Sequence, residues 1–224
     1  MADIEPIIIK DPKLKPLPFA GRVTSCDPAR FGDDTKSISD WIGTQVVDHE
    51  TYGKKDTMET VGRIMFHALK NKSTVIGIDP IIVPGIGDRL REVISGAGLK
   101  IMIVEVDFRE KSSNPDQWFN LRAEVYWHAR NLIKNKKCSI PDNPRLHGQL
   151  CSIKYKFMGG GKLGTRIKIE SKDDIKKRLG FSPDEADEFV IGLWVQRYAV
   201  VSKREGWRTA YKDSLQSGQS HMAA

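Results

Sequence analysis

Between positions 22 and 52, short apolar runs alternate with polar turns, a pattern typical of β-strands joined by tight connections. The predicted strands cover Val23 to Asp27, Ser37 to Ile42 and Thr44 to Tyr52. Gly43 is the single residue between the last two strands, which favours antiparallel pairing. We therefore predict that the fold begins with an antiparallel meander of three strands.

Helical spacing replaces this alternation after Asp56, a residue type that often caps helix N-termini. Apolar residues recur at that spacing from Met58 to Leu69, and the helix is expected to end near Lys72. The next predicted elements are a strand from Thr74 to Ile78, a helix from Gly87 to Ser95 and a strand from Lys100 to Val106. The order predicts an α/β fold with a mixed sheet flanked by helices, because parallel strands need helical crossovers.

Four further helices and a two-stranded ribbon are predicted in the second half of the chain. The expected elements are a helix from Asn114 to Asn135, a short helix after Pro144, a ribbon of 152–157 and 165–170, a short helix capped by Ser171 and ended by Gly180, and a last helix from Ser182 to about Val201. Glycines from 159 to 164 form the tip of the ribbon. This ribbon is an addition to the main sheet.

The 224 residues divide into three parts by composition. Residues 1–21 contain four prolines and predict an extended arm or linker, 22–201 a single folded domain, and 202–224 a polar, partly disordered tail. Apolar runs reach only about four residues, whereas a membrane span needs about 18. No secretion signal is recognisable, so we expect a cytoplasmic protein without a membrane partner. Three cysteines without a CxxC pair predict reduced core thiols.

Positive charge is concentrated in one region. Residues 109–180 hold 17 Lys and Arg against 7 Asp and Glu, a local charge of +10 within a chain of net charge +7. The predicted DNA-binding residues of the ribbon are Lys154, Lys156, Lys162, Arg166, Lys168 and Lys172. The five tryptophans do not interleave with these cations, so double-stranded DNA is favoured over single strands. Lysines that protect a strand edge from pairing are the alternative explanation.

Carboxylates mark the candidate chemistry. Asp27 and Asp79 each follow a strand of buried type, and Asp184 and Asp187 share one face at the start of the last helix. Convergence of carboxylates from separate elements suits hard divalent ions, and two such ions can activate water and stabilise the leaving oxygen of a phosphodiester. Singly, the same residues are ordinary turn and helix-start residues. The pattern alone leaves both interpretations open.

Several stretches resemble the nuclease domain of the bacteriophage terminase large subunit. They are residues 26–34 (CDPARFGDD), 77–79 (GID), 88–90 (DRL), 119–124 (FNLRAE), 150–155 (LCSIKY), 172–175 (KDDI) and 182–187 (SPDEAD). The resemblance implies a ribonuclease H-like fold and an endonuclease that cuts concatemeric viral DNA during packaging with Mg²⁺ or Mn²⁺, two ions being expected. It implies that Asp27, Asp79 and Asp187 form the metal-binding triad and that Asp184 is an auxiliary metal-binding acid, all four being catalytic. Arg30 joins the expected DNA-binding residues.

The resemblance also implies partners. These are the packaging ATPase domain, the small terminase subunit and the portal, in the cytoplasm of a host. The chain has no GxxxxGK[ST] sequence, so we expect an excised or separately encoded nuclease domain without the ATPase, monomeric in isolation. Two alternatives stay open: a Holliday junction resolvase, which would need a stable dimer, and a non-catalytic DNA-binding or motor-docking module of the same fold.

Overall fold

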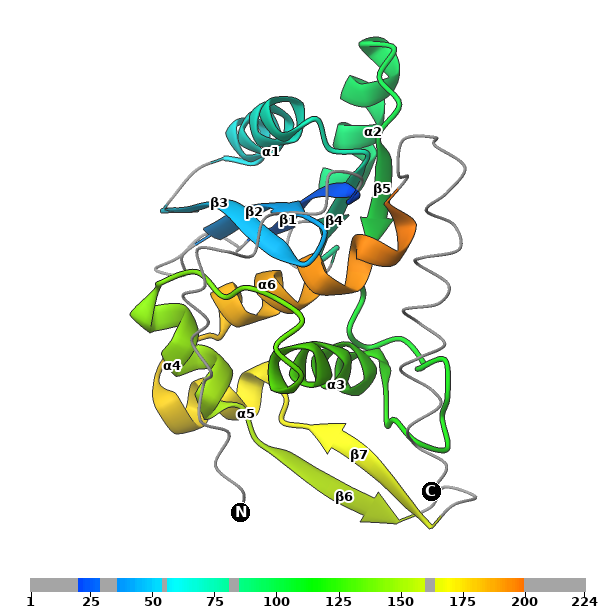
Figure 1. Cartoon of the computed structure of the whole chain (residues 1–224), viewed down its shortest axis with the longest axis vertical. Coiled ribbons are helices and arrows are strands. Elements are labelled where there is room, and N and C mark those ends of the chain that lie inside the picture. Colours follow the sequence, from blue (N-terminus) through cyan, green and yellow to red (C-terminus); the bar gives the residue numbers. More distant parts are fainter. Residues whose placement is uncertain (1–19, 29–35, 54–55, 81–84, 160–163, 200–224) are drawn as a thin grey trace.

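Five strands form one mixed sheet in the computed structural model, in the order β3-β2-β1-β4-β5 (Figure 1). β1 (Arg22–Asp27), β2 (Lys36–Ile42) and β3 (Gln45–Tyr52) are antiparallel neighbours, and β4 (Val75–Ile78) and β5 (Met102–Glu105) continue the sheet parallel to β1. The predicted α/β fold with its antiparallel meander is confirmed. The structure describes residues 20–28, 36–53, 56–80, 85–159 and 164–199.

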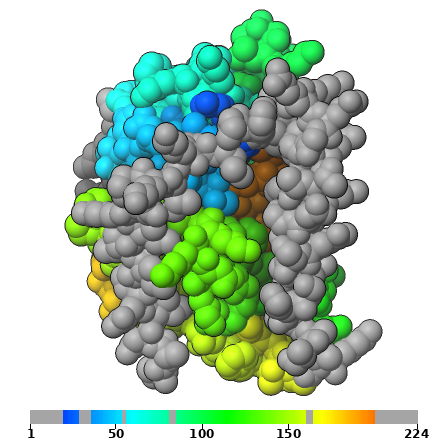
Figure 2. Space-filling view, viewed as in Figure 1, coloured from blue at the N-terminus to red at the C-terminus, as the bar shows by residue number. Residues whose placement is uncertain are grey.

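Helices cover both faces of the sheet. α1 (Thr57–Asn71) and α2 (Ile86–Gly96) lie over one face, and α6 (Asp184–Val195) lies over the other, with α3 (Leu121–Lys134) beyond it (Figure 1). Alternate residues of each strand therefore enter two separate apolar cores. The layers follow one another from α1 and α2 at the top to the ribbon at the bottom (Figure 2).

Close packing fixes α6 against the sheet. A Cβ atom added to Gly77 of β4 would lie 2.8 Å from the side chain of Val195, and one added to Gly192 would lie 2.3 Å from the Trp41 ring. Each is closer than van der Waals contact allows, so both positions need glycine for the helix and the strands to approach. The C-terminal half of α6 is thereby packed closely against β2 and β4.

Side-chain caps define several helix starts. The Asp56 carboxylate accepts from the Glu59 backbone N–H at 2.7 Å, as the sequence predicts for α1. Ser171 likewise caps α5 (Lys172–Leu179) by accepting from the Asp174 N–H at 3.1 Å. Both caps were predicted from the sequence, because capping involves only residues close together in the chain.

The predicted helix start at Asn114 is wrong. α3 begins at Leu121 with Asn120 as its cap, and the residues before it pair with the ribbon strand β7 (Thr165–Ile169). The Phe119 N–H donates to the Ile167 carbonyl at 2.9 Å. Backbone pairing with a distant strand has overridden the helical pattern of this segment.

Three smaller predictions also need correction. α4 (Pro144–Ser152) runs on into the segment predicted as strand, so β6 is Tyr155–Gly159. The last α-helix ends at Val195 and continues as a 3₁₀ turn, η1 (Gln196–Tyr198), instead of reaching Val201. Cys26 and Cys138 are buried thiols, whereas Cys151 is exposed and is not part of the core.

The predicted arm and tail lie almost entirely outside the described residues, as do the loop 29–35 and the ribbon tip 160–163. Among the described residues, no helix is long and apolar enough to cross a membrane.

Candidate metal centre

Two of the predicted acids end neighbouring parallel strands. Asp27 is the last residue of β1, and Asp79 follows β4 directly. Cys26 pairs with Ile78 in the parallel register, so the two aspartates lie at equivalent positions on the sheet edge. Both are buried and belong to the face covered by α6, because side chains alternate along a strand.

The other two predicted acids lie in the first turn of α6. Asp184 and Asp187 are both buried, and negative side chains are favourable near the positive end of a helix. The Ser182 hydroxyl donates to Asp184 Oδ1 at 2.5 Å, and Gln149 of α4 accepts from the Ala186 backbone N–H at 2.9 Å. The helix end is therefore anchored from two sides.

One lysine joins three of these carboxylates. Lys172 Nζ lies 3.0 Å from Asp27 Oδ2, 2.8 Å from Asp184 Oδ1 and 3.4 Å from Asp187 Oδ2. Burial alone would lower the pKa of Lys172, but the three negative charges outweigh it and raise that pKa well above its usual value. The structure thus brings β1 and α6 together around a single ammonium group.

Helix α3 contributes two further groups to Asp187. Arg122 Nη1 lies 2.9 Å from Asp187 Oδ1, and the Tyr126 hydroxyl donates to the same oxygen. Burial opposes the charge of Arg122, but the negative charge of Asp187 raises the pKa of Arg122 above its ordinary value. These contacts fix the orientation of the Asp187 carboxylate from below.

Three carboxylate oxygens of the cluster lack a hydrogen bond from the described residues, although one of them, Asp187 Oδ2, lies 3.4 Å from the Lys172 ammonium. Asp27 Oδ1, Asp184 Oδ2 and Asp187 Oδ2 are buried and have no hydrogen-bond partner among the described residues. Burial raises the pKa of Asp27 well above its usual value; the charge of Lys172 opposes this, and those of Asp184 and Asp79 add to it. Buried, unsatisfied carboxylate oxygens are the ligands that a hard divalent cation prefers, so the residues present fit Mg²⁺ or Mn²⁺.

A second group of metal-ligand type lies on the opposite face of the sheet. Ligand atoms of Asp40, Asp48 and His67 lie within 4.8 Å of one another. His67 is held by Asp40 at 2.8 Å and by Glu50 at 2.9 Å, and the hydrogen bond to Asp40, with that to Glu50, raises the pKa of His67 to about 9. Without a metal, His67 is therefore protonated at neutral pH and the group is an ion-pair cluster, so an ion would have to displace this proton.

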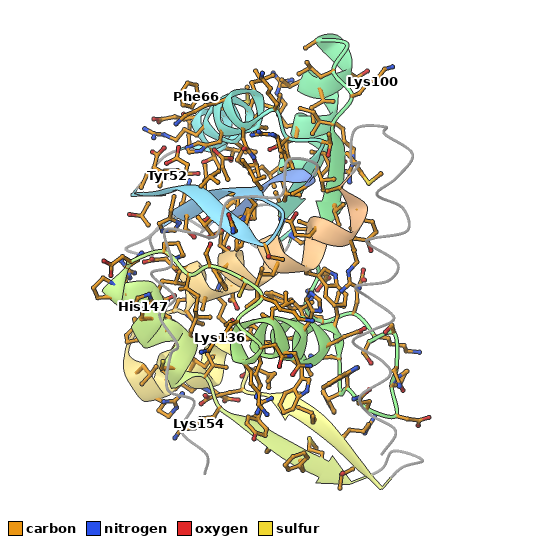
Figure 3. All side chains as sticks on the ribbon, viewed as in Figure 1. Tyr52, Phe66, Lys100, Lys136, His147 and Lys154 are labelled. Carbon is orange, nitrogen blue, oxygen red and sulfur yellow. The ribbon has the colours of Figure 1, made fainter. Side chains whose placement is uncertain are left out.

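The ribbon presents part of its predicted basic set together. Lys156 and Lys168 are directly opposed, and Arg166 and Lys168 lie over the Phe119 ring at 5.4 and 4.4 Å from its centre. Lys154 lies beside the start of β6, far from Phe66 on α1 (Figure 3).

Lys172, which was predicted to bind DNA with the ribbon, does not join this group. Lys172 is drawn into the acid cluster on α5, which corrects its assignment to the ribbon. Arg30 and Lys162 lie outside the described residues.

The sequence did not predict that three residues, Arg122, Tyr126 and Lys172, contact the aspartates of this cluster. Arg122 falls inside the stretch 119–124 that carried part of the resemblance, so that stretch held a usable signal. Tyr126 offered none beyond its helical spacing from Arg122.

Comparisons with solved structures follow this geometry. The fold matches the nuclease domain of the large terminase subunit of bacterial virus Sf6, with a TM-score of 0.62 and 19% identity over 77% of this chain and 87% of that domain. It also matches the large terminase nuclease domain of Thermus phage P74-26, with a TM-score of 0.53 and 12% identity over 79% and 80%. That of thermophilic phage G20c with bound magnesium matches with a TM-score of 0.52 and 13% identity over 80% and 82%. No protein-family model and no curated protein matches the sequence. At these identities the likeness establishes the fold.

Proposed function

We propose that the protein is a metal-dependent endonuclease that cuts viral DNA during genome packaging. The observation that carries the proposal is the buried cluster of Asp27, Asp184 and Asp187, in which three carboxylate oxygens have no hydrogen-bond partner among the described residues. Structurally similar domains are terminase nucleases, and solved examples hold manganese or magnesium.

Asp27, Asp79 and Asp187 would hold the divalent ions, two in number, with Asp184 as the assisting carboxylate. Bound there, Mg²⁺ or Mn²⁺ activates water for attack and stabilises the leaving oxygen of a phosphodiester. Arg122 and Tyr126 keep the Asp187 carboxylate in one orientation, because both contact its Oδ1 atom. A fixed ligand geometry lowers the reorganisation needed for catalysis.

Lys172 balances the carboxylates electrostatically. Its ammonium contacts three of them and is itself only partly exposed. Four aspartates without such a cation would repel one another at the sheet edge. Lys172 therefore keeps the acids assembled.

Double-stranded DNA is the proposed substrate, and the ribbon is its proposed contact. Lys154 and Lys156 are exposed, and Lys168 and Arg166 share a face with Lys156. Phosphate contacts do not read sequence, so alanine at these four positions should weaken binding equally for unrelated duplexes. Each lost contact should flatten the slope of log K against log salt by about 0.9. An unchanged slope would remove the ribbon from the binding surface.

The packaging ATPase domain, the small terminase subunit and the portal are the proposed partners, in the cytoplasm of an infected host. These assignments follow from the sequence resemblance, and the structural likeness to terminase nuclease domains supports them.

Cleavage of supercoiled plasmid tests the proposal directly. We expect nicked and linear products with Mg²⁺ or Mn²⁺ and none with excess chelator. Asp187→Asn should be inactive and Asp184→Asn impaired, while Asp48→Asn, which alters an acid on the opposite face, should cut at the wild-type rate. Cutting by Asp187→Asn at the wild-type rate would refute the proposed centre.

A further inference from the structure

On the face of the sheet that α6 covers, side chains of β1 and β2 lie in opposed pairs. β1 and β2 pair antiparallel, so that Val23 opposes Trp41, Ser25 opposes Ser39 and Asp27 opposes Ser37. Opposed residues point to the same face, with Cβ atoms about 5 Å apart. We call each such pair of opposed side chains a rung; the rungs follow one another along the face that α6 covers.

The first two rungs are fully satisfied. Trp41 packs against Phe189 with ring centres 5.2 Å apart, and its indole N–H donates to Ser25 Oγ at 2.7 Å. Ser25 and Ser39 both donate to the buried Glu188 carboxylate, the latter at 2.8 Å. Polar groups are buried here only with partners, as is usual in protein interiors.

The third rung, at the metal centre, is different. Ser37 is completely buried, and its hydroxyl has no hydrogen-bond partner among the described residues. Asp27 opposite is also completely buried; Lys172 binds its Oδ2 atom, whereas Oδ1 has no partner in the same part of the chain. Two unsatisfied polar groups on one rung are a costly arrangement unless a further polar species binds between them.

We propose that Ser37 is a further residue of the cation site, its hydroxyl holding a water ligand of the divalent ion at Asp27. This inference rests on the proposed function, because it assumes that Asp27 binds the ion. The hydroxyl can donate to or accept from water, and outer contacts of this kind orient the ligands of a metal. The site then extends from β1 toward β2, away from the β4 side that carries Asp79.

A purely structural role would leave a different trace. If Ser37 were only a small residue that fills space, alanine would serve equally and metal affinity would not change. Ser39 offers a matched control, because it lies on the same strand and face, one rung away, with a hydroxyl bonded to Glu188 and His49. Its removal should lower stability without metal.

The test compares Mn²⁺ binding by the full chain and its variants, measured from the EPR signal of the free ion. Ser37→Ala should weaken binding about tenfold, the effect typical of a contact that orients a metal's ligands. Its melting temperature without metal should stay level or rise. Ser39→Ala should melt at a lower temperature and bind Mn²⁺ within about twofold of wild type.

The outcomes separate this inference from the proposed function. Wild-type Mn²⁺ affinity in Ser37→Ala, or a loss no larger than that of Ser39→Ala, would overturn the role of Ser37 and leave the metal centre standing. Failure of the wild-type protein itself to bind Mn²⁺ would overturn the proposed centre, and the role of Ser37 with it.

Discussion

The two faces of the sheet each bury a cluster of acids and bases, and the clusters differ in how they are satisfied. Around His67, Asp40 and Glu50 each bind one ring nitrogen, and Lys70 binds Asp48 at 2.6 Å. At the opposite face, three carboxylates share Lys172 and retain unsatisfied oxygens. A count of acidic residues alone would therefore not tell which of the two clusters binds a metal.

The difference shows that residue type does not identify a metal site by itself. In the His67 cluster, the carboxylates already bind the imidazole of His67 or the ammonium of Lys70, so a divalent ion would have to displace these groups. In the Asp27 cluster, burial and the neighbouring carboxylates raise the pKa of Asp27, and three carboxylate oxygens have no hydrogen-bond partner among the described residues. The four predictions below test that contrast, beginning with the largest expected effect.

Asp27→Asn should reduce plasmid cleavage by about 100-fold or more, because it removes a charged ligand from the proposed metal centre. Removal of one charge also relieves repulsion, so the melting temperature without metal should stay level or rise. Single-turnover cleavage and thermal unfolding measure the two effects. A variant that loses activity only because it unfolds would contradict the proposed role.

Asp40→Asn should have the opposite pair of effects, lowering stability and leaving cleavage unchanged. It breaks a buried pair with His67 and should lower the free energy of unfolding by about 3 kcal/mol. Cleavage per folded molecule should not change, since Asp40 faces the other side of the sheet. Urea unfolding, combined with cleavage assays at a temperature where the variant is folded, checks both parts.

Mn²⁺ should stabilise the protein only through the Asp27 cluster. At about 100 times its Kd, the ion should raise the free energy of unfolding by about 2.7 kcal/mol. The Asp40→Asn variant should keep this increment and Asp27→Asn should lose most of it. If Asp40→Asn lost the increment instead, the ion would bind on the wrong face.

The His67 cluster should give the stability a pH dependence. Its folded pKa of about 9 lies above the unfolded value near 6.5, so its stabilisation is complete below pH 6.5 and is lost as pH rises through 9. We expect a loss of about 3 kcal/mol over this range. Urea unfolding of wild type and of His67→Gln isolates the contribution, because the other titrating groups are common to both. Parallel pH profiles would contradict it.

Local signals in the sequence determined most of the helices and strands. Asp56, Ser171 and Gly180 mark helix ends because capping involves residues within one turn of each other. The sequence also placed Asp27 and Asp79 at strand ends, and the sheet brings them to one edge. The domain limits at 22 and 201 stay predictions.

Local signals failed where a distant segment competed. Residues 114–120 carry helical spacing, yet the backbone of Phe119 pairs with Ile167 of the ribbon. The sequence likewise could not show that Lys172 binds the acid cluster and not DNA, since a positive charge favours both kinds of contact.

Periodicity and capping, which depend on neighbours a few residues apart, were thus determined by the sequence itself. Only the tertiary structure decided which charges meet. It placed Arg122 of α3 on Asp187 and Lys172 of α5 among the acids of β1 and α6, and it left Ser37 without a hydrogen-bond partner in the described chain. Electrostatic and hydrogen-bond satisfaction depends on distances of a few ångströms between elements far apart in the chain, and packing of α6 on the sheet sets those distances.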